Sequence, residues 1–183
     1  MISTRPDPIS GIDSSIEGQR RRQAEAREVL AQETEVLHLA LASGLVDSAQ
    51  IASWANAVIR ILGSADPVLC ALATAGSSPA VVVARLLRSV SGARCSNAAQ
   101  YEVLWVLSKA LEQDPGKARR IAGALERLAG SGLAPDLEHP IRVKAFSRRL
   151  ETGAGGSTGG GESVTAELRD FLAMRLSVAG RVA

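Results

Sequence analysis

The residues of this sequence that could carry out chemistry are few and far apart. Its two histidines, His38 and His139, belong to no HExxH pattern and to no cluster of cysteines and histidines. A zinc site needs three or four such ligands, so the sequence predicts no metal site. His38 lies in an apolar stretch, where we expect a structural or half-exposed histidine. His139 precedes a proline, as expected at a helix start.

The two cysteines, Cys70 and Cys95, have neither CxxC spacing nor a neighbouring histidine. We expect both to be small buried residues in a reducing compartment, without a disulfide. There is no GxSxG motif and no cysteine with a local base, so nucleophilic catalysis is not predicted. We therefore expect no enzyme. A catalytic site assembled from distant residues is the least favoured of three functional hypotheses.

A glycine-rich segment over 152–161 (TGAGGSTGGG) is superficially similar to a phosphate-binding loop. The Walker pattern requires GK[ST] at its end, but Gly161 is followed by Glu162 and Ser163. A dinucleotide-binding loop would in addition follow a β-strand, and none is predicted here. The segment is therefore interpreted as a flexible tether, and no cofactor is expected.

Basic residues are concentrated in the middle of the chain. Residues 85–149 carry 12 basic and 6 acidic side chains, whereas residues 1–84 carry 6 basic and 9 acidic ones. The candidate partner-binding residues are Arg119, Arg120, Arg142, Lys144, Arg148 and Arg149. They could be solvated helix faces, a surface for an acidic protein, or a phosphate-binding face for nucleic acid. No aromatic residues alternate with them, which disfavours the last alternative.

The elements that must position these residues are predicted to be helices. The chain has 183 residues, of which 46% are hydrophobic and only 3% aromatic, so its core must be aliphatic. Residues 1–13 are expected to form a flexible arm. Ser14 and Glu17 match a capping box that opens a long helix over 15–42, with a polar first half projecting into solvent. Asp47 and Gln50 match a second capping box.

After Asp47, apolar residues recur at helical spacing up to Gly63, which predicts a helix with one continuous apolar stripe. Asp-Pro, Ser-Pro and His-Pro pairs indicate further helix starts near 67, 79, 115 and 140. Another helix is expected over 97–113, capped by Ser96 or Asn97. Because its centre, VLWVL, is apolar all round, it is predicted to be buried in the middle of the protein.

Together these patterns predict an all-α fold, an irregular bundle of about eight helices. The expected organisation is a helical domain over 14–151, a Gly-rich linker over 152–162 and a C-terminal helix within 163–183. The apolar stripe of that last helix must pack on its own chain or on a partner, which could be a second copy. No signal peptide or membrane span is recognised, so a cytoplasmic location is expected.

One stretch resembles a known group of proteins. It resembles a pattern of small all-helical bacterial proteins at Gly44–Asp47, Trp54-Ala55-Asn56, Ile59, Pro67 and Leu72-Ala73. Some of these act as immunity or toxin-neutralising proteins, although Asn56 stands where they have an acidic residue. The resemblance implies a helical fold that binds protein and has no active site.

These observations lead to two main functional expectations. The first is a non-catalytic helical protein that binds another protein, as an immunity-like inhibitor or adaptor does. The alternative is a nucleic-acid-binding regulator that uses the basic face of residues 117–149.

Overall fold

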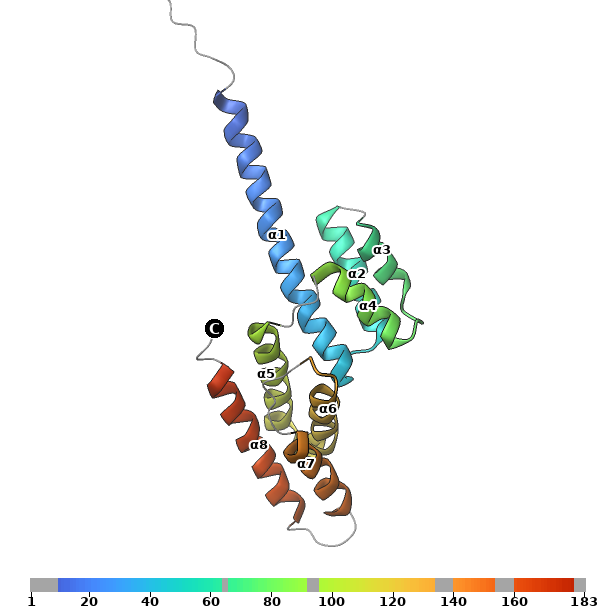
Figure 1. Cartoon of the computed structure of the whole chain (residues 1–183), viewed down its shortest axis with the longest axis vertical. Coiled ribbons are helices and arrows are strands. Elements are labelled where there is room, and N and C mark those ends of the chain that lie inside the picture. The colour runs from blue at the N-terminus through green and yellow to red at the C-terminus, as the bar shows by residue number, and fades with distance from the viewer. Residues whose placement is uncertain (1–9, 64–65, 92–95, 134–139, 154–159, 180–183) are drawn as a thin grey trace, which may run out of the picture.

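A computed structural model describes residues 10–63, 66–91, 96–133, 140–153 and 160–179. Within these ranges the chain forms eight α-helices, one short 3-10 helix and no strand, so the predicted all-α irregular bundle is confirmed (Figure 1). The elements, in order, are α1 (Ser10–Ser43), α2 (Ser48–Leu62), α3 (Pro67–Thr74), α4 (Ala80–Ser91), α5 (Asn97–Gln113), η1 (Pro115–Lys117), α6 (Ala118–Gly130), α7 (Pro140–Gly153) and α8 (Gly160–Ala179).

Helices α2, α3 and α5 begin at the capping residues that the sequence predicts. The carboxylate of Asp47 accepts a hydrogen bond from the backbone N–H of Gln50 at 2.8 Å, and the Gln50 side chain accepts one from the Asp47 N–H at 2.9 Å. Asp66 caps α3 in a similar way, and the hydroxyl of Ser96 caps α5. Such side chains satisfy backbone N–H groups that have no partner within the helix.

Three predicted boundaries are wrong, namely the start of the first helix and both ends of the linker. Helix α1 begins at Ser10, so Ser14 lies inside the helix and is not its N-cap. Polar residues cost a helix only up to about 0.7 kcal/mol each, so one capping pattern does not prevent the helix from continuing past it. Helices α7 and α8 also extend into both ends of the predicted linker, as far as Gly153 and from Gly160. The centre of the linker (154–159) and residues 1–9 of the predicted arm lie outside the described residues.

Two hydrophobic cores share helix α1. The first, in an N-terminal lobe formed by α1 to α4, contains Leu41 together with Ile51, Leu72 and Leu87. The second contains Leu39 of α1 and otherwise buried residues of α5 to α8, which form a C-terminal lobe. Leu39 and Leu41 are two positions apart, about 200° around a helix, so they point to nearly opposite sides. Helix α1 is therefore the element against which both lobes pack.

Two polar contacts also connect the lobes through α1. The guanidinium of Arg127 in α6 donates two hydrogen bonds, at 3.0 and 2.8 Å, to the carbonyl oxygen of Ser43 at the C-terminal end of α1. The carboxylate of Glu35 accepts a hydrogen bond from the backbone N–H of Ser96 at 2.9 Å. A cation at a helix C-terminus is favourable because the last carbonyl groups carry partial negative charge.

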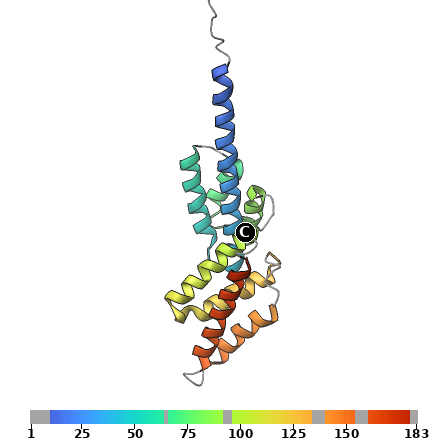
Figure 2. The same ribbon diagram turned by 90° about the vertical axis from the view of Figure 1, so that its left-hand side faces the viewer.

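The N-terminal half of α1 extends beyond both lobes, as the polarity of its sequence predicts. Figures 1 and 2 show the same projection in two views at right angles. Its described side chains from Ala24 to Val29 are all exposed. With 34 residues, α1 is about 51 Å long, so its packed C-terminal end supports a long exposed segment.

Two burial predictions are wrong for the same reason. Helix α5 is not buried all round, because Trp105 and Val106 are 46% and 44% exposed. Cys70 is exposed as well, whereas its neighbour Leu69 and nearby Leu72 occupy the core. Neighbouring helices cover only one side of α5 and one side of α3, and sequence composition does not indicate which side is covered. Cys95 lies outside the described residues.

The last helix packs on its own chain, one of the two arrangements that its sequence allows. Val164, Leu168, Phe171 and Leu172 of α8 are buried in the second core, between α5 and α7. The Phe171 ring contacts that of Phe146 in α7 edge to face, with ring centroids 5.7 Å apart.

Candidate functional site

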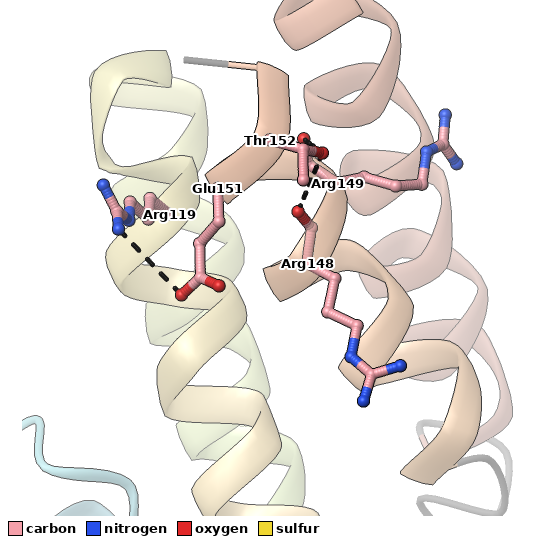
Figure 3. Close-up of polar contacts among 5 residues, drawn as sticks. All are labelled: Arg119, Arg148, Arg149, Glu151 and Thr152. Carbon is pink, nitrogen blue, oxygen red and sulfur yellow. Dashed lines mark hydrogen bonds and ion pairs between the residues drawn. The ribbon is translucent and has the colours of Figure 1, made fainter. Parts of the chain in front are cut away.

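The basic residues predicted to bind a partner lie on α6 and α7, and two of them are ion-paired. Figure 3 shows Arg119 of α6 beside Glu151, whose carboxylate lies 3.9 Å from the guanidinium. Arg149 of α7 donates hydrogen bonds of 2.7 and 2.9 Å to Glu167 of α8. These hydrogen bonds raise the pKa of the Arg149 guanidinium. Both arginines therefore hold helices of their own lobe together.

Of the other four predicted basic residues, the structure describes the side chains of three. Arg120, Lys144 and Arg148 are exposed. Figure 3 shows the guanidinium of Arg148 directed away from those of Arg119 and Arg149. The side chain of Arg142 lies outside the described residues. The three arginines drawn in Figure 3 thus point in different directions.

A different surface has the shape of a binding site, namely a groove along the exposed part of α1. Two adjoining hollows of about 430 and 440 Å³ share Val29 and Glu33. The wall on α2 is formed by Trp54, Val58, Ile61 and Leu62. We call this surface the α1–α2 groove. Figure 2 shows α2 lying alongside α1 below its projecting end.

Helical spacing explains why these residues share one surface. On α1, the lining residues Glu25, Val29, Glu33 and Val36 follow each other at intervals of three or four. On α2, Val58 follows Trp54 by four positions, and Ile61 and Leu62 follow Val58 by three and four. Residues at this spacing lie on one face of a helix. The apolar stripe of α2 therefore extends beyond the residues that are buried in the core, and its C-terminal end lines the groove.

The apolar residues of the groove are unusually exposed. Ile61 is 82% exposed, Val29 57% and Leu62 44%. Large apolar side chains that gather on one surface are typical of an interface, whereas isolated ones are not informative. Complete burial of one such side chain by a partner contributes about 1.5–3 kcal/mol.

Every charged residue that lines the two hollows is a glutamate. These are Glu25 and Glu33 of α1 and Glu102 of α5. Glu33 accepts a hydrogen bond from the indole N–H of Trp54 at 3.2 Å, and Glu25 accepts one from Arg21 at 3.0 Å. The groove therefore combines an apolar surface with a negative potential, in agreement with the acidic balance of residues 1–84.

The few aromatic residues add a second reason to consider this surface. The chain has two Trp, one Tyr and two Phe, and both Phe are in the core. Trp54 lines the groove, while Tyr101 and Trp105 are 36% and 46% exposed on α5. Glu102 lines the groove from α5, and Trp105 lies three positions after it, on the same side of that helix. Trp and Tyr are enriched at the centres of protein–protein interfaces.

The remaining candidates for chemistry lie elsewhere. His38 is only 4% exposed, a buried histidine in α1, and burial together with the charge of Arg88 lowers its pKa. His139 lies outside the described residues. Among the residues that the structure describes, no three His, Cys, Asp or Glu side chains are grouped as a metal site would require.

Sequence reasoning missed the groove, although two signals for it were present. The stripe of α2 continues to Leu62, beyond the buried Ile51 and Ala55, and the apolar half of α1 begins at Val29 and Leu30, before its first core residue, Leu39. Neither signal shows which helices lie side by side. This juxtaposition results from the tertiary arrangement, and only the structure reveals it.

Comparison with protein-family models, with curated proteins and with solved structures finds no match for this chain. Within the described residues, no helix combines the length and the apolar character needed to span a bilayer.

Proposed function

We propose that the protein acts by binding another protein and that the α1–α2 groove is the binding surface. One observation carries the proposal, namely that Val29, Ile61 and Leu62 are exposed side by side in a groove with Trp54 in its wall. A partner that covers them would remove apolar surface from water, which is the main driving force of protein association. A toxin-neutralising role, implied by the resemblance of residues 44–73, is one form of this proposal.

The basic residues of α6 and α7 support the nucleic-acid alternative less well. Arg119 and Arg149 are each paired with a glutamate, and Arg148 points away from both. Binding to nucleic acid draws its affinity from several phosphate contacts made together. The two ion pairs occupy Arg119 and Arg149, which leaves fewer of the predicted residues for such contacts.

A pair of matched variants tests the proposal. Ile61→Asp places a charge in the groove, and Val81→Asp places one on α4, at a valine that is 68% exposed and does not line the groove. Neither residue is buried, so both variants are expected to fold. The tagged proteins are used for affinity purification from the native host, with mass spectrometry of the bound proteins.

A stoichiometric partner that elutes with the unmodified protein and with Val81→Asp, but not with Ile61→Asp, is the expected result. A partner retained equally by all three proteins would show that another surface binds it. Nucleic acid in place of a protein partner would favour the basic-face alternative.

A further inference from the structure

We infer that the occupant of the α1–α2 groove is a basic amphipathic α-helix of a partner protein. This inference rests on the proposed function and adds the chemistry and the shape of the partner. Three observations carry it, namely the sign of the charges in the groove, its length, and the kind of element that forms its walls.

The charges select a basic partner. Glu25, Glu33 and Glu102 are the charged residues that line the groove, and no lysine or arginine lines it. Glu25 also forms an exposed ion pair with Arg21, so Glu33 and Glu102 carry most of the charge preference. A partner with carboxylates or phosphates beside its apolar residues would meet like charges there, which costs affinity. A partner with lysine or arginine would place each cation near a carboxylate that is still in contact with water. Such pairs contribute modestly to affinity but strongly to the choice of partner.

The dimensions fit about three turns of a helix. On α1 the lining residues extend from Glu25 to Leu37, which is about 18 Å at a rise of 1.5 Å per residue. Glu25 and Glu33 are eight positions apart, about 12 Å along the helix axis. Two basic residues seven or eight positions apart on a bound helix have the same separation and would reach both carboxylates.

The walls of the groove favour a helix over an extended peptide. Both long walls, α1 and α2, are helices whose interior backbone groups are already hydrogen-bonded within the helix. No sheet edge is present among the described residues to which an extended peptide could add a strand. An extended peptide would bring unpaired N–H and C=O groups onto an apolar surface, whereas a helix satisfies its own.

A second copy of the chain fits this description less well than a separate partner does. The most basic described helices are α4, α6 and α7, and each already buries an apolar face in its own lobe. The buried residues include Val83 and Leu87 of α4, Ile121 and Leu125 of α6, and Val143 and Phe146 of α7. A second copy would have to open its own core to present the buried face of any of these helices. The argument from charge and packing therefore points to another protein.

The test uses a random 16-residue peptide library, displayed on phage and selected on the full-length protein. Selected peptides are expected to carry a net positive charge and apolar residues at i, i+3 or i+4, and i+7, and to become helical when bound. Their binding should be lost with Ile61→Asp and retained with Val81→Asp.

Glutamine substitutions then test the charges directly. Glu25→Gln, Glu33→Gln and Glu102→Gln together should weaken binding of a selected peptide about tenfold. Binding of the same peptide to the unmodified protein should weaken as salt increases, because salt screens the charges. The matched control replaces Glu17, Glu112 and Glu162 by glutamine, which changes the net charge equally and should leave the affinity within about twofold.

Several results would overturn the inference. Selected peptides that are acidic or neutral would show that the glutamates do not select the partner, and proline-rich peptides would show that it is not a helix. Absence of any selected peptide would also count against it. A dimer of the unbound protein that Ile61→Asp dissociates would identify the occupant as a second copy. If the peptide results fail while Ile61→Asp still releases the cellular partner, the proposed function stands and only the basic helix is wrong.

Discussion

Gly44 and Arg127 lie close together at the junction of the two lobes, with little space for a side chain at position 44. Gly44 has a φ of +69°, in the left-handed region that side chains other than glycine disfavour. A Cβ at this position would lie 3.0 Å from Nη2 of Arg127, the atom that donates to the Ser43 carbonyl. Backbone conformation and close approach therefore both require glycine here.

Gly44→Ala is expected to lower the free energy of unfolding by about 1–3 kcal/mol, because the substitution adds backbone strain and displaces Arg127. Urea denaturation followed by circular dichroism measures the change. Gly130→Ala is the control, since a Cβ there meets nothing within 4 Å. It should cause no loss of stability, and an equal loss in both variants would contradict the explanation.

His38 makes the stability dependent on pH. Burial, and to a smaller extent the charge of Arg88 on α4, lowers its pKa below the ordinary 6.5. The unfolded chain therefore takes up a proton more readily than the folded one. The stability that neutral His38 permits is present above about pH 6.5 and is lost as the pH falls below that value.

The free energy of unfolding should accordingly decrease between about pH 7 and pH 5, and His38→Gln should make this decrease smaller. Urea titrations of both proteins across that range measure the two slopes. The comparison concerns slopes, so a uniform loss of stability in the variant does not affect it. Identical slopes would show that His38 does not contribute.

At the scale of the elements, α8 contributes a full face to the second core. Leu168 is completely buried, whereas Met174 on the same helix is 44% exposed. Leu168→Ala is expected to cost about 2–5 kcal/mol, and Met174→Ala less than about 1 kcal/mol, as measured by urea denaturation. Similar small losses in both variants would show that α8 is not part of the core.

Prediction from sequence succeeded best for the helices, because caps and apolar stripes depend on residues that are close together in the chain. The caps at Asp47, Asp66 and Ser96 depend on hydrogen bonds within three residues, so the sequence contains all the information that determines them. The apolar stripe of α8 was likewise predictable, because its periodicity is a property of the helix alone.

Features that depend on which helices meet were not predictable in the same way. Trp105 lies in a run of apolar residues, yet it is exposed because the neighbours of α5 cover only its other side. Cys70 is exposed for a similar reason. The groove needs Ile61 of α2 to lie beside Val29 of α1, and no pattern within either segment specifies that pairing.

At the scale of the whole molecule, the lobes are joined through α1 and are expected to unfold together. Leu39 and Leu41 place the same helix in both cores, and Arg127 and Glu35 add polar contacts across the junction. Unfolding of one lobe would expose one side of α1 and weaken the packing of α1 against the other lobe. A single cooperative transition follows from this arrangement.

The two tryptophans allow a direct measurement, because Trp54 lies in the N-terminal lobe and Trp105 in the C-terminal lobe. Trp54→Phe and Trp105→Phe each leave one fluorescent reporter. Unfolding midpoints in urea, each compared with circular dichroism of the same variant, should coincide within each protein. Two separated transitions would show that α1 does not couple the lobes.

The position of α1 ahead of α2 to α8 in the chain has a consequence for synthesis on the ribosome. The helix that both lobes need is made first, and α2 to α4 can pack on it while the rest of the chain is still being translated. Until α5 to α8 follow, the side of α1 that bears Leu39 has no core to cover it. During this stage the nascent N-terminal lobe exposes apolar surface on α1, and a chaperone can bind there. In the finished protein this surface is covered by the C-terminal lobe.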